Sequence, residues 1–129
     1  MDYELTQADL IWNRATLEDG GKSLAPGDVA LSSLLHAHGL TMNGGVLHAV
    51  ELLTSDELAA AKNGYRYFGL SDVADLLTYA ETLFDAVENM GEQERQLDAK
   101  YATFIPDDSS LVKRFEEQFV ANPSAFAPM

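Results

Sequence analysis

The chain has 129 residues, in which 21 Asp and Glu outnumber eight Lys and Arg and give a net charge of −13 at pH 7. Hydrophobic residues make up 47% of it, which is typical of a globular protein and excludes a disordered acidic tail, and so negative a surface disfavours direct binding to nucleic acid or anionic membranes. The absence of cysteine excludes disulfides and thiolate chemistry, and neither a secretory leader nor a run of about 18 apolar residues is found, so a cytoplasmic protein is expected.

Helix start and stop signals recur from the N-terminus onward. Thr6 predicts the start of a first helix, which Gly20-Gly21 ends. Pro26 suits the first turn of a second helix, and Gly39 predicts its stop. Asn43 is expected to cap a third helix, because apolar residues recur at helical spacing after it.

The middle of the chain carries the clearest helical pattern. Thr54 and Glu57 have capping-box spacing and predict a fourth helix. Ser71 predicts the start of the fifth and longest helix, which is expected to reach about Asn89 or Met90 and to be broken by Gly91. Its apolar residues fall on one stripe, in a pattern that a strand could not use: Val73, Leu76, Leu77, Ala80, Leu83, Phe84 and Val87.

Two further helices complete the prediction. The sixth covers residues 92–104 and is closed by Pro106, and the seventh is capped by Asp107 and stopped by Asn122 and the proline after it. Alternation of period two and runs of β-branched residues, which would indicate strands, are missing. We therefore predict an all-α protein, a compact single-domain bundle of about six to seven short helices that comprises residues 1–129.

Three histidines, His36, His38 and His48, are the only candidates for proton transfer near neutral pH or for nitrogen ligation to a metal. His36 and His38 point about 200° apart on a helix, so they cannot share a metal ion without ligands from elsewhere in the chain. Surface or partly buried histidines are the favoured interpretation. Asn43-Gly44-Gly45 resembles half of a phosphate loop but lacks the Lys and Ser/Thr that grip phosphate. Nothing places a serine on the strained elbow of a catalytic triad. No catalytic residue, metal site or cofactor is predicted.

The acidic residues fall into two groups. Six lie at predicted helix starts, where a negative charge stabilises the helix by about 0.3–1 kcal/mol: Asp28, Asp56, Glu57, Asp72, Asp107 and Asp108. The second group, which we call the acidic stripe, consists of Glu81, Asp85, Glu88 and Glu92, with no Lys or Arg interleaved. Like charges at these spacings repel one another along a helix face. We expect the acidic stripe to bind a partner, and the alternative is a merely solvated face.

Four short segments between residues 34 and 126 carry a family resemblance: Asn43-Gly44-Gly45-Val46-Leu47-His48, Tyr65-Arg66-Tyr67-Phe68-Gly69-Leu70, Leu97-Asp98-x-x-Tyr101, and a tail with Phe115, Val120, Asn122-Pro123 and Phe126. They are similar to the bacterial DNA-mimic-protein-like domain, except that Val46 stands where that family has an aromatic residue and His48 where it has glutamine. The resemblance implies an all-helical protein that is often a homodimer. The protein after which the family is named has a surface of carboxylates that imitates DNA and binds a DNA-binding protein in its place, and the resemblance implies such a surface here. It marks Asn43, Gly44, Gly45 and His48 as a family-like structural motif.

Two classes of function follow from these patterns. The first is a non-enzymatic interaction protein whose acidic face binds a basic protein, such as a DNA-binding protein or a basic toxin, by electrostatic complementarity. The second is a metal-dependent or carboxylate-based hydrolase that uses acids gathered between helices, although the Glu-x-x-His signature of such sites is missing. The first class is favoured, with a basic protein as the expected partner.

Overall fold

Every regular element in the described part of the chain is a helix. The computed structural model describes residues 7–17, 25–83 and 90–127. Its elements are α1 (Gln7–Leu17), α2 (Pro26–Gly44), α3 (Val46–Leu52), α4 (Ser55–Tyr67), α5 (Ser71–Leu83), α6 (Met90–Phe104), α7 (Asp108–Ala121) and the short 3-10 helix η1 (Pro123–Ala125). The prediction of an all-α bundle is confirmed. In these ranges no helix combines the length and the apolar composition that crossing a membrane requires.

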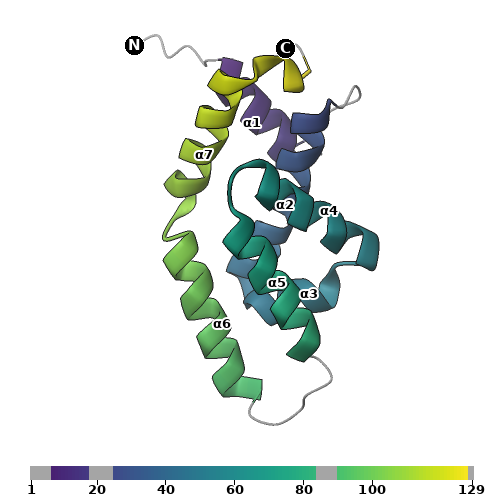
Figure 1. Cartoon of the computed structure of the whole chain (residues 1–129), viewed down its shortest axis with the longest axis vertical. Coiled ribbons are helices and arrows are strands. Elements are labelled where there is room, and N and C mark those ends of the chain that lie inside the picture. The colour runs from purple at the N-terminus through teal and green to yellow at the C-terminus, as the bar shows by residue number, and fades with distance from the viewer. Residues whose placement is uncertain (1–6, 18–24, 84–89, 128–129) are drawn as a thin grey trace.

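The helix α2 runs through the middle of the molecule and packs against α1, α3 and α4. In Figure 1, α6 and α7 follow one another along one side, while α3, α4 and α5 lie on the other. The helix α6 contacts α3 and α5, and η1 returns to α2. The C-terminal residues therefore lie at the same end of the molecule as α1 (Figure 1).

Helices α2 and α4 pack closely against each other in the core. Leu34 of α2 and Tyr65 of α4 are both buried in the main apolar cluster. Gly64 lies against the carbonyl oxygen of Ala30, so a Cβ at this position would overlap that oxygen. Because glycine has no Cβ, the two helix backbones approach more closely here than any other residue would permit.

Three predicted helix starts are confirmed by their hydrogen bonds or position. The hydroxyl of Thr54 accepts the N–H of Glu57 at 3.1 Å, and the Glu57 carboxylate accepts the N–H of Thr54 at 3.0 Å. At the start of α7, the carboxylate of Asp107 accepts the N–H of Ser110 at 3.1 Å. Pro26 is the first residue of α2. Each start is encoded by groups within about one turn of it.

The predicted stop at Gly39 is wrong, because α2 continues to Gly44. Gly39 is exposed, while Ala37 before it and Thr41 after it are buried on the inner face of the same helix. A single glycine inside a helix costs about 1 kcal/mol relative to alanine. Burial of the residues on either side outweighs this cost, so the helix passes through the glycine.

Two other predicted boundaries change. Asn43 belongs to the last turn of α2 and does not cap α3. The sixth helix begins at Met90 and contains Gly91, whereas its predicted start was Glu92. The predicted break of the fifth helix at Gly91 is wrong, because Gly91 lies within α6. Residues 84–89 of the predicted fifth helix lie outside the described ranges.

One buried ion pair joins both ends of the described chain. Asp28, in the first turn of α2, accepts a hydrogen bond from Arg14 of α1 at 2.8 Å. Its other oxygen accepts the backbone N–H groups of Ala25 at 3.1 Å and Ala127 at 2.8 Å. Arg14 also donates to the carbonyl of Ala127 at 3.0 Å. The Asp28 carboxylate therefore holds α1, the start of α2 and the C-terminal segment together. The sequence predicted only that its charge would stabilise the start of α2.

Candidate functional site

The acidic stripe is divided between two helices. Glu81 lies on α5, where its carboxylate is 2.7 Å from the Nζ atom of Lys62 on α4, and Glu92 lies in the first turn of α6. Asp85 and Glu88 are outside the described residues. The expectation of an unpaired acid is therefore wrong for Glu81, while Glu92 lies at the start of the sixth helix, close to where that helix was predicted to begin. The role of the acidic stripe in binding a partner stays a prediction.

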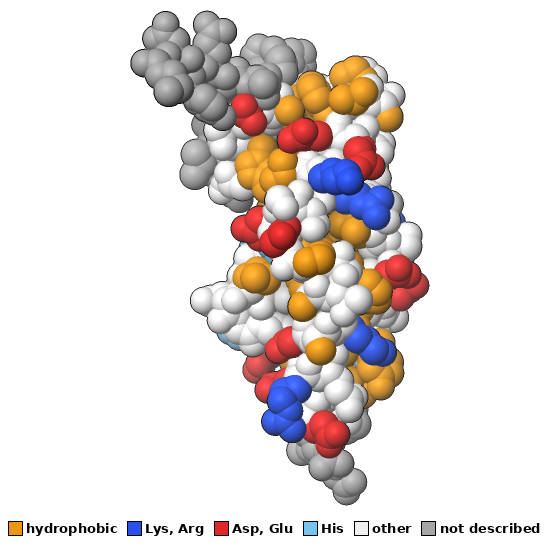
Figure 2. Space-filling model, turned by 90° about the vertical axis from the view of Figure 1, so that its left-hand side faces the viewer, with side chains coloured by type: hydrophobic (Ala, Val, Ile, Leu, Met, Phe, Trp, Pro, Cys, Tyr) orange, Lys and Arg blue, Asp and Glu red, His pale blue; other side chains and the backbone are white. Residues whose placement is uncertain are grey.

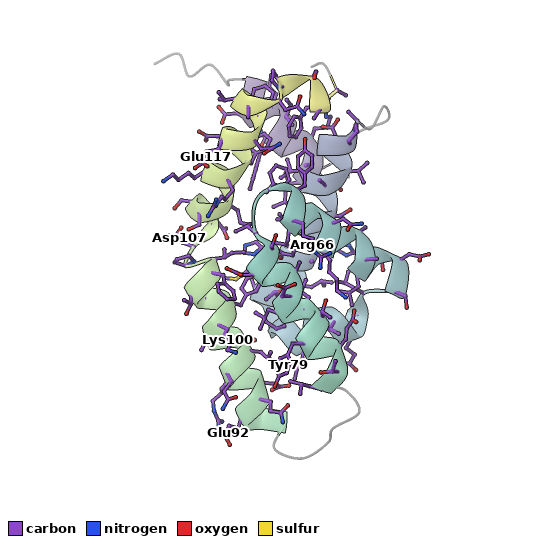
Figure 3. The ribbon with its side chains drawn as sticks, in the orientation of Figure 1. Arg66, Tyr79, Glu92, Lys100, Asp107 and Glu117 are labelled. Atoms are coloured by element: carbon purple, nitrogen blue, oxygen red, sulfur yellow. The ribbon has the colours of Figure 1, made fainter. Side chains whose placement is uncertain are left out.

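The side of the molecule formed by α6 and α7 carries charges of both signs. Figure 2 views this side and shows Lys and Arg next to Asp and Glu. In Figure 3, Glu92 and Glu117 lie toward opposite ends of this column of helices, with Lys100 between them. The basic residues of these two helices are Arg95, Lys100, Lys113 and Arg114. This side is therefore not a continuous acidic surface.

The family-like motif forms the junction between α2 and α3. Asn43 and Gly44 end α2, and Gly45 follows with a φ of 98°, in the left-handed region that favours glycine. Asp98 of α6 lies against Gly45, and its carboxylate accepts the N–H of Val46 at 2.9 Å. Asp98 therefore supplies the cap of α3 that Asn43 was predicted to supply.

His48, the last member of the motif, is partly buried on α3. Its ring packs against Gly44, where a Cβ would overlap it. It does not line the nearby hollow of about 350 Å³ beside Gly45 and Tyr101. The described contacts of the motif are thus those of a packed turn.

A groove of about 900 Å³ lies between α1, α2, α4 and the start of α7. The partly exposed side chains of Leu35 and Ala60 give it apolar surface. Its aromatic and titratable lining residues are Trp12, His36, His38, Asp56, Glu57 and Asp108. No Lys or Arg of the described ranges lines it. We call this feature the acidic groove.

Each histidine of the acidic groove stands beside a carboxylate. The Nδ1 atom of His36 is 3.8 Å from an oxygen of Glu57, and the Nε2 atom of His38 is 2.8 Å from an oxygen of Asp108. His36 is exposed, whereas the side chain of His38 is only 9% exposed against 77% for Asp108. The two histidines meet different carboxylates, as their separation around the helix predicts.

A chain of hydrogen bonds leads from the acidic groove into the core. The Nδ1 atom of His38 is 2.7 Å from the hydroxyl of Tyr101, which is 2.8 Å from the hydroxyl of Tyr65. An ionised carboxylate only accepts hydrogen bonds, so a neutral His38 donates from Nε2 to Asp108 and accepts at Nδ1 from Tyr101. Tyr101 in turn accepts from Tyr65. Every donor in this chain then has an acceptor.

Burial raises the pKa of both tyrosines well above the usual 10.0. For Tyr101, burial outweighs the hydrogen bond with Tyr65, which lowers the pKa, and the negative charge of Asp108 raises it further. For Tyr65, the neighbouring Tyr101 adds to the effect of burial. Both hydroxyls therefore stay protonated near neutral pH, and neither serves as a base or nucleophile there.

Tyr65→Phe should lower the free energy of unfolding by about 1 kcal/mol near pH 7, because one buried hydrogen bond is lost. The folded chain retains the Tyr65 proton above pH 10, whereas the unfolded chain releases it. This contribution to stability is full below pH 10 and is lost above it, by about 1.4 kcal/mol per pH unit. Urea denaturation at about pH 7.5 and about pH 11 should show the gap between wild type and variant closing or reversing.

The matched control is Tyr79→Phe, since Tyr79 is 54% exposed on α5 (Figure 3). Removal of a hydroxyl that is already in water leaves the pH dependence of stability as in the wild type. A gap between wild type and Tyr65→Phe that stays constant up to pH 11 would contradict the raised pKa of Tyr65.

Local patterns in the sequence do not reveal the acidic groove. The sequence pattern explains the carboxylates of the groove as charges at helix starts, and it favours surface or partly buried positions for the histidines. His38 and Asp108 are 70 positions apart, and only the packing of α7 beside α2 brings them together. The spacing of Asp98 and Tyr101 on α6 signals contacts beside the groove and not the groove itself, since Asp98 binds Val46 and Tyr101 binds His38.

Within the described residues, no group of three His, Cys, Asp or Glu side chains is placed to hold a metal ion. Asp28, the buried acid of these ranges, is paired with Arg14. The hydrolase alternative thus has no supporting observation there. Fold and groove together define an acidic helical protein with a carboxylate-lined groove. Comparison of the chain with models of protein families, with curated proteins and with solved structures finds no match.

Proposed function

We propose that this chain is a non-enzymatic interaction protein that binds a basic protein through its carboxylates. A DNA-binding protein and a basic toxin both have the required chemistry. Imitation of DNA, which the family resemblance implies, is one form of such binding. Homodimerisation stays a separate prediction.

The unequal distribution of charge supports this proposal. On α1 to α5, each described Lys and Arg is held by an acid, in the pairs Arg14–Asp28, Lys62–Glu81 and Arg66–Asp75. Four acids of the same helices have no ion pair with Lys or Arg in the described ranges: Glu51, Asp56, Glu57 and Asp72. Carboxylates whose charge is not compensated attract cations and accelerate their encounter.

A defined basic probe tests the proposal: a dye-labelled peptide of alternating arginine and serine, eight residues long. Fluorescence anisotropy in about 50 mM salt should show binding, and the Kd should rise about tenfold in about 300 mM salt because ions screen exposed charges. A peptide with citrulline in place of arginine has nearly the same shape without the charge and should not bind. Equal binding of the two peptides, or binding of neither, would reject the proposal.

The acidic stripe has its own variant in the same assay. Replacing Glu81, Asp85 and Glu88 by Gln should abolish binding of the arginine–serine peptide if the partner lies along the acidic stripe. Circular dichroism of this variant should show unchanged helicity. Unchanged capture would remove the stripe as the binding surface. It would leave other carboxylates of the chain to carry the proposed function.

A further inference from the structure

We propose that the acidic groove receives an arginine-bearing segment of the basic partner, and that protonation of His36 and His38 weakens the binding of this segment. The site and its control by pH rest on the proposed function, because they specify where and when the basic partner binds. They do not follow from it, since a basic partner could also bind along the acidic stripe or at the exposed acids of other helices.

Both parts of an arginine side chain find matching surface in the acidic groove. The apolar stem can lie on the partly exposed Leu35 and Ala60, with Trp12 available to the cationic head. The planar guanidinium forms paired hydrogen bonds to carboxylates, which the exposed Asp56 and Glu57 provide. A volume of about 900 Å³ is that of a site for a small ligand. It therefore fits a few side chains of a segment and not a folded domain.

The histidines set the charge that such a segment meets. With both neutral, the acidic groove carries the three negative charges of Asp56, Glu57 and Asp108. With both protonated, one net negative charge remains. Histidine is the side chain whose ordinary pKa, near 6.5, lies in the physiological range. Protonation of the two histidines thus weakens the attraction and places a competing cation beside two of the carboxylates.

His38 is surrounded by groups from three other helices. Asp108 of α7 faces its Nε2 atom, Tyr101 of α6 faces its Nδ1 atom, and Tyr65 of α4 lies behind Tyr101. A protonated ring donates from both nitrogens, so Tyr101 must become an acceptor. One of the two tyrosine hydroxyls then loses the acceptor that it had, while the ion pair with Asp108 becomes stronger. A protonated His38 therefore holds Asp108 more firmly than a neutral one.

His36 faces α4 and α1. Glu57 lies 3.8 Å away, Asp56 is the neighbouring acid on the same turn, and α1 contributes Trp12 and Thr16, which do not titrate near neutral pH. The Thr54 backbone hydrogen bond lowers the pKa of Glu57 below its usual 4.5, with the Thr54 hydroxyl and His36 adding to the effect. Glu57 therefore remains charged throughout the mildly acidic range of the experiment.

The only tryptophan of the chain, Trp12, lines the acidic groove and reports on its occupation. Titration with the unlabelled arginine–serine peptide at about pH 7.5 should change the Trp12 emission with the Kd that anisotropy gives. At about pH 5.5 the Kd should be about three- to tenfold higher, which is the effect of two charge pairs whose carboxylates are exposed to solvent. Binding by anisotropy that leaves Trp12 emission unchanged would place the segment elsewhere and overturn the assignment.

Two matched triple variants separate the acidic groove from total charge. Asp56→Asn, Glu57→Gln and Asp108→Asn together should raise the Kd about tenfold. A control variant with Glu94→Gln, Glu116→Gln and Glu117→Gln removes the same charge from exposed positions of α6 and α7, and its Kd should change less than about threefold. Equal weakening in both variants would overturn the groove while leaving the proposed function intact. Failure of the wild type to bind any arginine peptide would reject the proposed function itself.

The dependence of peptide binding on the two histidines is tested with a variant and with a measurement on the wild-type protein. His36→Gln with His38→Gln should make the Kd nearly equal at the two pH values, provided that circular dichroism shows a folded protein. Calorimetry of the wild type near pH 6.5, in two buffers of different ionisation enthalpy, should show release of protons when the peptide binds. A wild-type Kd that is the same at both pH values, or binding without proton release, would overturn the control by histidine.

Discussion

Asp28→Ala should lower the free energy of unfolding by about 3–5 kcal/mol, because it removes the carboxylate that compensates a largely buried guanidinium. Asp28 is 1% exposed, and its oxygens accept hydrogen bonds from Arg14 and from the N–H groups of Ala25 and Ala127. A domain has a total stability of only about 5–15 kcal/mol, so this change consumes much of it. Urea denaturation followed by circular dichroism measures the effect.

Asp72→Ala is the matched control, since Asp72 also lies in the first turn of a helix but is exposed. Its loss should cost less than about 1 kcal/mol. Arg14→Met combined with Asp28→Asn should cost less than the sum of the two single changes by at least about 1 kcal/mol, because neither charge is then buried alone. Equal costs for the Asp28 and Asp72 variants would mean that Asp28 acts only as a charge at a helix start.

The all-α fold and the starts of α2, α4 and α7 were predictable, because capping and helical periodicity act within a few residues. The side chains of Thr54 and Glu57 bind each other's backbone N–H groups, and the spacing of three between them makes this capping box recognisable in the sequence. The start of α3 was not predictable in the same way. The N–H of Val46 is bound by Asp98, which lies 52 positions further along the chain. A local cap at Asn43 was therefore the wrong choice.

The candidate site was less predictable than the fold, since the composition gives the net charge of the chain but not where the charged side chains lie on its surface. Spacing rules along one helix identified Glu81 as an unpaired acid, yet Lys62 reaches it from a neighbouring helix. The same rules assigned Asp108 to a helix start, whereas its carboxylate also binds His38. Both contacts depend on how helices pack. They become visible only when the tertiary arrangement is known.

Gly64→Ala should destabilise the fold by about 3 kcal/mol and lower the Tm by roughly 10 °C. A Cβ at Gly64 would overlap the carbonyl oxygen of Ala30 and lie 3.3 Å from the Cβ of Leu34. The carbonyl belongs to the backbone of α2 and cannot rotate away, so α4 must move from α2. Thermal unfolding of the variant measures this cost, and an unchanged Tm would show that the two helices are not in such close contact.

Gly39→Ala is the same chemical change in α2 and should have the opposite sign. A Cβ at Gly39 meets nothing within 4 Å, so the helix gains about 0.5–1 kcal/mol from replacing glycine. The acidic groove lies between α2, which carries His36, and α4, which carries Glu57. If Gly64→Ala still folds, its displaced α4 should also weaken binding of the arginine peptide, while Gly39→Ala should leave the spacing of the helices unchanged. The short distance between α2 and α4 that Gly64 permits would then be required both for packing of the core and for peptide binding in the acidic groove.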